Sequence, residues 1–170
     1  SRFKSTSRTF RVSAPQLWNL LPTPHLEYCI QAWRPHLVKD IEILEKVQRR
    51  ATRMIEECRG RPYQERLNIL RLTTLETRRE RADMLEVFKI MNRWEGLEEN
   101  TFFKRAGGIT RGHHLKLYKE GCKKDWLKFS FGHRVIDKWN KLPGNVLGCL
   151  GINAFKTNLD KWLRHNWGKL

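Results

Sequence analysis

The 170-residue chain is long enough for one domain, or for a small helical domain with a tail, and its 34 Lys and Arg against 18 Asp and Glu give a formal net charge of +16. No run of about 18 apolar residues occurs, and the start Ser1-Arg2-Phe3-Lys4 lacks the apolar block of a secretory signal, so we expect a soluble intracellular protein, nuclear or cytoplasmic, that enters no membrane. The four cysteines are scattered without a Cys-x-x-Cys pair, which argues against a disulfide framework and a zinc ribbon.

The first 23 residues form an extension that stands apart from the rest of the sequence. Its segment Phe10 to Pro22 repeats a pattern near the other end, at Phe131 to Pro143, because both share Phe, Trp-Asn, Leu and Pro at matching positions. In both copies Trp and Leu are suited to packing, and Pro prevents the local element from continuing. We therefore expect residues 1–23 to be dispensable for the helical block that follows.

Apolar residues follow helical periods from Pro24 to about Trp94, whereas Gly and charged residues interrupt every run from Glu95 onward. This pattern predicts a mainly α protein with a compact four-helix block at residues 24–94. A basic, partly ordered segment is expected at residues 95–170, ending in one amphipathic helix. The inner positions of that last helix are Phe155, Leu159, Trp162 and Leu163.

The first two helices of the predicted block precede and follow Arg34-Pro35, a step that disfavours helical geometry at the residue before the proline. The expected inner face of the first helix is Leu26, Cys29, Ile30 and Trp33. The second helix, about Val38 to Cys58, is expected to have an apolar and a cationic face. The apolar face is Ile41, Leu44, Val47, Ala51, Met54 and Ile55, and the cationic face is Lys46, Arg49, Arg50 and Arg53.

A third helix at Tyr63 to Leu70 and a fourth that runs to about Trp94 complete the predicted block. Thr73-Thr74-Leu75-Glu76 has the spacing of a capping box and marks the start of the fourth helix. The expected inner face of the fourth helix is Leu75, Ala82, Leu85, Phe88 and Met91. Arg78, Arg79 and Arg81 crowd its start, where positive charge is unfavourable, so either nearby Glu76 and Glu80 or an external anion offsets them.

Several stretches of the sequence together resemble one family. They are Pro24-His25-Leu26-Glu27-Tyr28-Cys29, Lys39-Asp40-Ile41, Leu44-Glu45-Lys46-Val47-Gln48-Arg49-Arg50-Ala51-Thr52, Tyr63-x-Glu65-Arg66-Leu67, Leu75-Glu76-x-Arg78-Arg79, Arg111-Gly112-His113-x-Leu115-Lys116-Leu117, Arg134-Val135-x-x-x-Trp139-Asn140-x-Leu142-Pro143 and Phe155-Lys156-x-x-Leu159-Asp160. They are similar to the thumb and C-terminal segment of LINE-type (non-LTR) retrotransposon reverse transcriptases of the chicken-repeat and jockey-like clades. The resemblance implies a thumb that grips the template–product duplex and a C-terminal segment that assists binding of the element's RNA and target DNA.

The palm motif of that family, an aromatic and a variable residue followed by two aspartates, is absent, since the chain contains no Asp-Asp dipeptide. Polymerisation needs carboxylates that hold two metal ions, so we expect neither enzyme activity nor a cofactor from this chain alone. The extension looks like the family's C-terminal motif placed ahead of the thumb. A splice between two element copies near residues 22–24 would produce this order.

The predicted nucleic-acid contacts are Lys46, Arg49, Arg50, Arg53, Arg78, Arg79, Arg81, Arg111 and Lys116. Charged helix faces are usually only solvated, but the charge excess and the resemblance favour phosphate contact here. The predicted partner is RNA or DNA, bound with little sequence preference. The alternatives are a helical protein-interaction module, whose helices are left exposed by the missing palm, and a translated retroelement fragment without function.

Two further site types are disfavoured in the C-terminal segment. His113 and His114 with Cys122 and Cys149 lack the spacing of a four-ligand zinc site, so no bound metal is expected. Neither a nucleophile motif nor a phosphate-binding glycine loop accompanies the histidines. The tryptophans that suit base stacking are Trp126 and Trp167, which lie among Lys and Gly, whereas Trp33, Trp94, Trp139 and Trp162 are expected in the core.

Overall fold

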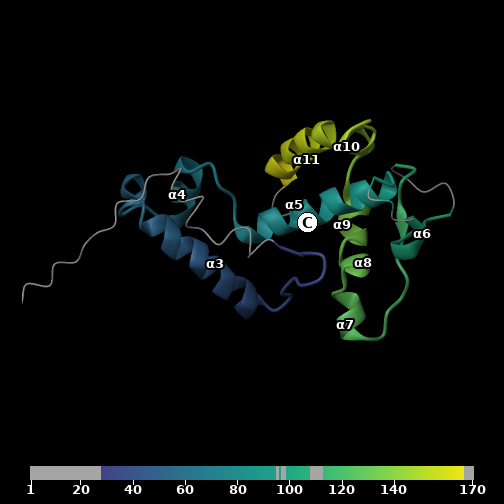
Figure 1. Ribbon diagram of the computed structural model, residues 1–170, viewed down its shortest axis with the longest axis horizontal. Helices are drawn as coiled ribbons and strands as arrows, with labels where there is room; N and C mark the ends of the chain where they lie inside the picture. The colour runs from purple at the N-terminus through teal and green to yellow at the C-terminus, as the bar shows by residue number, and fades with distance from the viewer. Residues whose placement is uncertain (1–27, 95, 97–98, 108–112, 167–170) are drawn as a thin grey trace, which may run out of the picture. The chain divides into compact units, whose positions relative to one another are not determined.

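The computed structural model describes residues 28–166 apart from 95, 97–98 and 108–112, and it confirms a mainly helical protein. Its α-helices are labelled in Figure 1. In chain order the elements are α3 (Val38–Arg53), the 3-10 helix η1 (Glu56–Cys58), α4 (Tyr63–Ile69), α5 (Leu75–Met91), α6 (Glu99–Phe102), β1 (Lys104–Arg105), β2 (Leu117–Tyr118), α7 (Asp125–Lys128), α8 (Phe131–Arg134), α9 (Ile136–Lys141), α10 (Gly144–Leu147) and α11 (Ile152–Asn166). The two strands pair antiparallel, with Lys104 opposite Tyr118 and Arg105 opposite Leu117. The predicted extension at residues 1–23 lies outside the described residues.

The described chain divides into two compact units. The N-terminal unit consists of residue 28 with residues 35–78, and the C-terminal unit consists of residues 29–34 with residues 79–166. The division falls inside α5, whereas the sequence pattern places a boundary after residue 94. The two differ because the later part of α5 buries its apolar side chains in a core shared with the segments that follow it.

Residues 28–32 form a turn where the sequence predicts the first helix. Cys29 adopts a left-handed backbone with φ of 48°, a conformation that a regular right-handed helix does not contain. The N–H groups of Ala32 and Trp33 both donate to the carbonyl of Cys29, at 2.9 and 3.1 Å, so a single turn forms and is not continued. The expected inner face is wrong as well, since Trp33 is 40% exposed, although Ile30 is buried.

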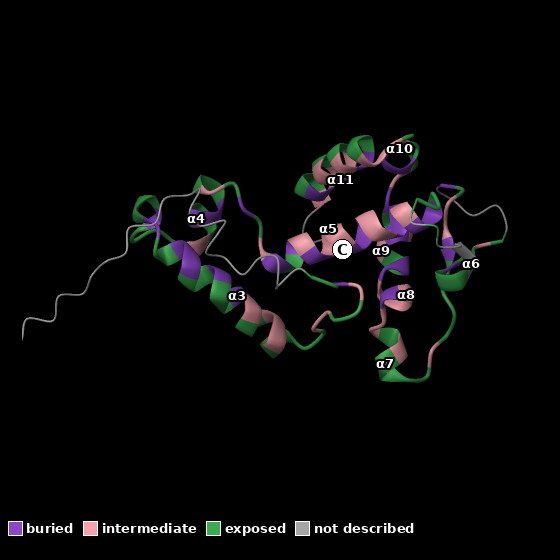
Figure 2. Cartoon of the chain, viewed as in Figure 1, coloured by how far each residue is buried: buried purple, intermediate pink, exposed green. Residues whose placement is uncertain are grey.

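Helix α3 ends at Arg53, and η1 covers the last residues of the predicted second helix. Its buried positions are Glu45, Gln48, Ala51 and Thr52, so most of the inner face is polar. Two residues predicted to face inward are instead exposed, Val47 by 38% and Met54 by 49%. Figure 2 shows buried and exposed positions alternating along the helix. The prediction failed here because it counted apolar side chains, whereas hydrogen bonds fix this face of α3.

A buried hydrogen-bond network ties α3 to α4 and to the start of α5. The Glu45 carboxylate accepts hydrogen bonds from the Tyr63 hydroxyl and from the Leu75 N–H, the latter at 2.9 Å. The Gln48 amide donates to the Tyr63 hydroxyl at 2.9 Å and to the Thr73 carbonyl at 3.0 Å. Burial raises the pKa of Tyr63 above its ordinary value, and the hydrogen bond to Glu45 raises that pKa further. The small apolar core beside this network is Ala51, Ile55, Cys58, Leu67 and Leu72.

The third and fourth predicted helices are present as α4 and α5. The hydroxyl that caps α5 belongs to Thr74, which accepts a hydrogen bond from the Thr77 N–H at 3.2 Å. The predicted capping box placed this role one residue earlier, at Thr73 with Glu76. Thr73 instead uses its carbonyl, as an acceptor for Gln48.

The C-terminal unit holds the larger core, where the sequence predicts a partly ordered segment. Short helices bring together apolar residues that the sequence separates with Gly and charge. Trp139 and Phe155 are fully buried, and the rings of Phe88 and Phe155 stack with centroids 4.1 Å apart. The predicted terminal amphipathic helix is confirmed as α11, with Phe155, Leu159 and Leu163 buried.

Trp139 and Asn140 of α9 hold the strand β2 through its backbone. The Trp139 indole N–H donates to the Leu115 carbonyl at 2.8 Å. The Asn140 side chain accepts from the Leu117 N–H and donates to the Leu117 carbonyl, both at 2.8 Å. The Trp-Asn pair of the repeated motif therefore acts in this unit by binding an extended segment, as well as by packing.

A buried carboxylate, Asp83, organises the polar interior of the C-terminal unit. Asp83 is 1% exposed and accepts hydrogen bonds from Arg34 at 2.8 Å and from Arg134 at 2.9 and 3.0 Å. Arg134 also donates to the carbonyl of Ile30 at 2.9 Å. This network fixes the turn at residues 29–34 against α5 and α8, which is why that turn belongs to the C-terminal unit.

Candidate nucleic-acid interface

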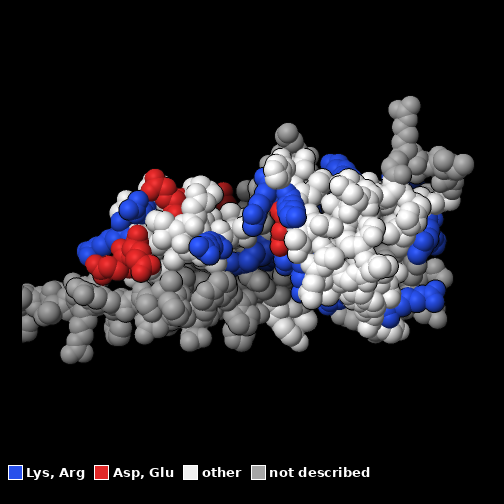
Figure 3. Space-filling view, turned by 90° about the horizontal axis from the view of Figure 1, so that it is seen from above, with Lys and Arg blue, Asp and Glu red and all other residues white. Residues whose placement is uncertain are grey.

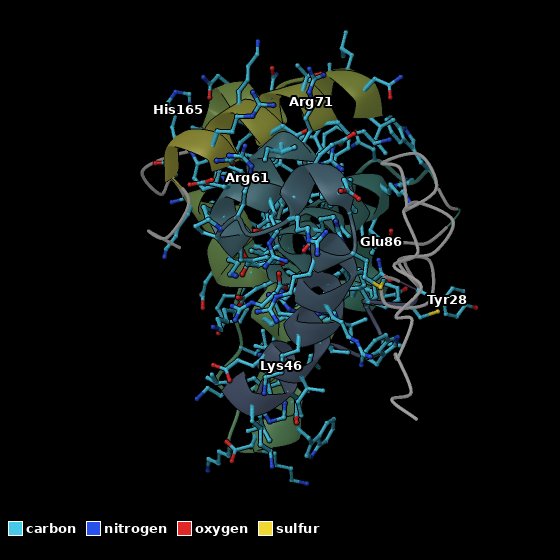
Figure 4. All side chains as sticks on the ribbon, turned by 90° about the vertical axis from the view of Figure 1, so that its left-hand side faces the viewer. Tyr28, Lys46, Arg61, Arg71, Glu86 and His165 are labelled. Carbon is cyan, nitrogen blue, oxygen red and sulfur yellow. The ribbon has the colours of Figure 1, made fainter. Side chains whose placement is uncertain are left out.

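Four of the predicted contact residues lie together on the solvent-facing side of α3. Their side chains, all exposed, are Lys46, Arg49, Arg50 and Arg53, and Figure 4 shows Lys46 on this helix. Within the described part of the chain, none of them forms an ion pair with a carboxylate. We call these four residues the α3 cationic face.

The local sequence explains why α3 can carry this charge. Asp40 lies in its first turn, and Arg50 and Arg53 lie in its last turn, where each charge complements the helix dipole. Because Glu45, Gln48, Ala51 and Thr52 form the inner face, Lys46 and Arg49 lie on the side of the helix that faces solvent. The helix is thus compatible with unpaired positive charge along its outer side.

The predicted contacts at the start of α5 have partners inside the protein. Arg78 donates to the Gln48 amide oxygen at 2.7 Å. Arg79 is 1% exposed, and its guanidinium lies 5.6 Å from the ring centroid of Trp33. Arg81 pairs with Asp160 at 2.5 and 2.9 Å. Asp160 therefore offsets the charge of Arg81 from within the chain, and Arg79 is not on the surface.

The other predicted contacts are distributed differently. Arg111 lies outside the described residues, and Lys116, half-buried, directly precedes β2. Trp126 is 70% exposed on α7, and Lys128 of that helix and Lys124 just before it are also exposed. Trp167 also lies outside the described residues. Among the tryptophans expected in the core, Trp139 is fully buried, whereas Trp94 is 46% exposed.

The sequence did not identify Arg66 of α4, although it belongs to one of the stretches that carry the family resemblance. Arg66 is 3% exposed, and its guanidinium donates to the carbonyl of Arg49 on α3 at 2.9 Å. Tyr63, three residues earlier, lies under the guanidinium groups of both Arg49 and Arg66. The three-residue spacing of Tyr63 and Arg66 places both on one side of a helix. It does not show whether the arginine on that side is buried.

The histidines and cysteines of the C-terminal unit do not gather. His113 is buried, and neither of its ring nitrogens has a hydrogen-bond partner within the described part of the chain. Burial lowers the pKa of His113 below its ordinary value of 6.5. Among residues that the structure describes, no three His, Cys, Asp or Glu side chains are placed to share a metal ion.

Surface charge is uneven. On the face of the C-terminal unit visible in Figure 3, Lys and Arg lie around a broad area without charged side chains. On the N-terminal unit the same view shows acidic and basic side chains next to one another. The α3 cationic face differs from both surfaces. Its four cations form no ion pair with a carboxylate among the described residues.

None of the helices in the described ranges combines the length and the apolar character needed to cross a membrane. Comparison of the chain with models of protein families, with curated proteins and with solved structures found no match.

Proposed function

We propose that this chain is a non-catalytic nucleic-acid-binding protein, derived from the thumb and C-terminal region of a LINE-type reverse transcriptase, and that it grips RNA or DNA by its backbone through the α3 cationic face. The observation that carries the proposal is the set of four exposed cations, Lys46, Arg49, Arg50 and Arg53, without carboxylate partners among the described residues. The family resemblance of the surrounding stretches supports the same assignment.

Binding of this kind is driven by release of counterions from the phosphates, and it reads little sequence. Four phosphate contacts predict a slope of about −3.5 in the log–log dependence of affinity on salt for duplex DNA, from about −0.9 per phosphate. The affinity should be similar for unrelated sequences of equal length. Because the chain lacks paired palm aspartates, it should not extend a primed RNA template with Mg²⁺ or Mn²⁺.

The test is fluorescence anisotropy of labelled duplexes across a salt series with the full chain. Replacing Arg49, Arg50 and Arg53 by Gln should flatten the slope by about 2–3 and weaken binding to all sequences alike. The matched control replaces Lys156, Lys161 and Arg164 of α11 by Gln, which removes the same net charge from another helix. An equal change of slope in both triple variants would mean that net charge, and not the α3 cationic face, drives binding.

A second candidate function is a protein-interaction module, favoured by the exposed apolar side chains on α3. Val38 is 72% exposed, Ile43 55% and Val47 38%, so one helix presents three large apolar side chains to solvent. Apolar docking depends little on salt, whereas phosphate contact weakens steeply with it. The salt series that tests the first proposal therefore separates the two.

A further inference from the structure

Arg66 is a buried cation without a carboxylate partner in the part of the chain that the structure describes. It is 3% exposed, its Nη1 donates to the Arg49 carbonyl at 2.9 Å, and its buried Nε has no hydrogen-bond partner. Buried charges are normally paired, because an isolated charge in the interior is costly. Arg34 and Arg134 follow that rule in the C-terminal unit, where both bind Asp83.

The guanidinium groups of Arg49 and Arg53 add to the positive charge around Arg66. The guanidinium carbons of Arg49 and Arg66 lie 5.0 and 5.2 Å from the ring centroid of Tyr63. Burial lowers the pKa of Arg66 below its ordinary value, and the charges of Arg53 and Arg49 lower that pKa further. Repulsion between like charges is thus present here, and no nearby carboxylate relieves it among the described residues.

The surrounding contacts hold the side chains of Arg66 and Tyr63 in place. The Arg49 carbonyl accepts from the Thr52 hydroxyl at 3.1 Å as well as from Arg66. The Tyr63 hydroxyl is fixed by Glu45 and Gln48, so the ring that both guanidinium groups contact has a defined orientation. Residues 1–27, which are not described, contain a single carboxylate, Glu27, against four Lys and Arg. That part of the chain therefore offers little negative charge.

We propose that Arg49 and Arg66, which both contact the ring of Tyr63, form with Arg53, one helical turn after Arg49, a phosphate-binding site in the N-terminal unit that takes one phosphate group of the nucleic-acid backbone. The planar guanidinium fork matches the oxygens of a phosphate and can bind two of them at once. A phosphate would supply the anion that the cluster lacks. This inference rests on the proposed function, and it adds Arg66 and Tyr63 to the residues that the sequence identifies.

Inorganic phosphate is the first probe, because a ligand that binds the folded state raises the unfolding midpoint. Thermal unfolding of the full chain is compared in phosphate and in chloride at equal ionic strength and pH. We expect phosphate to raise the midpoint by a few degrees. The rise should be lost in Arg66→Lys, which keeps the charge but loses the fork, and in Arg53→Gln, where the side chain is exposed and the fold is not at risk.

Lys39→Gln is the matched control, because Lys39 is also exposed on α3 but lies in its first turn. It should keep the wild-type response to phosphate, which would show that loss of an exposed α3 cation does not by itself remove the response. Any rise that remains in Arg66→Lys measures the general effect of phosphate as a salt. The same midpoint rise in wild type, Arg66→Lys and Arg53→Gln would overturn the site.

Binding of duplex DNA by the same variants separates failure of this site from failure of the proposed function. Arg66→Lys should weaken duplex binding by roughly ten-fold, as expected for loss of one charge-assisted contact. Phosphate-dependent stabilisation without nucleic-acid binding would leave the site standing and overturn the proposed function. Nucleic-acid binding that is unchanged in Arg66→Lys, together with no response to phosphate, would overturn the site and leave the proposed function standing.

Discussion

Arg81 of α5 and Asp160 of α11 form an ion pair with two hydrogen bonds, from Nε to Oδ1 at 2.5 Å and from Nη2 to Oδ2 at 2.9 Å. The two residues are 79 positions apart in the sequence, and both belong to the C-terminal unit. The carboxylate occupies the fork that a phosphate would need. In this structure Arg81 therefore joins two helices of one core.

Replacing Arg81 by Gln should lower the free energy of unfolding by about 0.2–1 kcal/mol, the range for partly exposed ion pairs. Urea unfolding measures this change. The salt dependence of nucleic-acid binding should stay at its wild-type slope, because Arg81 contacts no phosphate in our proposal. A slope that flattens by about 1 would instead restore Arg81 to the interface.

The Asp83 network predicts a much larger effect. Asp83→Asn removes the charge that both Arg34 and Arg134 bind, and it leaves Arg34 with Glu80 alone and the largely buried Arg134 without a carboxylate among the described residues. Loss of one partner from a buried network costs about 3–5 kcal/mol, so the C-terminal unit should unfold at a much lower urea concentration. The control is Asp137→Asn, which removes an exposed carboxylate paired with Lys119. Similar urea midpoints for the two variants would contradict the role assigned to Asp83.

Thr74 and Thr73 offer a matched pair for the start of α5. Thr74→Ala removes the hydroxyl that accepts from the Thr77 N–H and should lower the free energy of unfolding by about 0.5–2 kcal/mol. Thr73→Ala should have little effect, because Thr73 acts through its carbonyl and its side chain is exposed. Chemical unfolding of both variants decides between Thr74 and the capping position predicted from sequence.

His113 should make the protein less stable in mild acid. Its pKa in the folded protein lies below 6.5 because of burial, so below that pH the unfolded chain takes up a proton that the folded chain does not. The free energy of unfolding should therefore be fully retained above pH 6.5 and fall below it, by at most about 1.4 kcal/mol per pH unit.

Urea midpoints at neutral and mildly acidic pH test this dependence. His113→Phe fills the same space without a titrating group, so its midpoint should fall less in acid than that of the wild type. His114→Gln, which removes the exposed neighbouring imidazole, should behave as the wild type does. An acid response that is identical in wild type and His113→Phe would exclude His113 as its cause.

Local signals in the sequence predicted those helices whose ends and inner faces depend on nearby residues. Helices α4 and α5 begin and end near the predicted positions, and α11 buries Phe155, Leu159 and Leu163 as predicted, because local turn signals and apolar spacing agree there. The helix predicted before Arg34 failed because Cys29 adopts a left-handed backbone and the segment is bound instead by Arg134, 104 residues away. No pattern within a few residues contains that information.

The candidate site shows the same limit. The α3 cationic face could be predicted, since its four members follow one helical side and need no distant partner. Arg79 and Arg81 could not be separated from them by sequence, because Trp33 and Asp160 bind them only in the folded unit. Arg66 was missed because sequence spacing gives the side of a helix but not whether a charged side chain on that side is buried.

The side chain of Asn140 covers part of the edge of the two-stranded sheet. Leu117 lies in a sheet of two strands, and its N–H and carbonyl are both taken by the Asn140 amide. An unpaired strand edge is a template on which other chains can add and aggregate. One amide therefore closes this edge at Leu117 as a third strand would, and its loss would first appear as reduced solubility at high concentration.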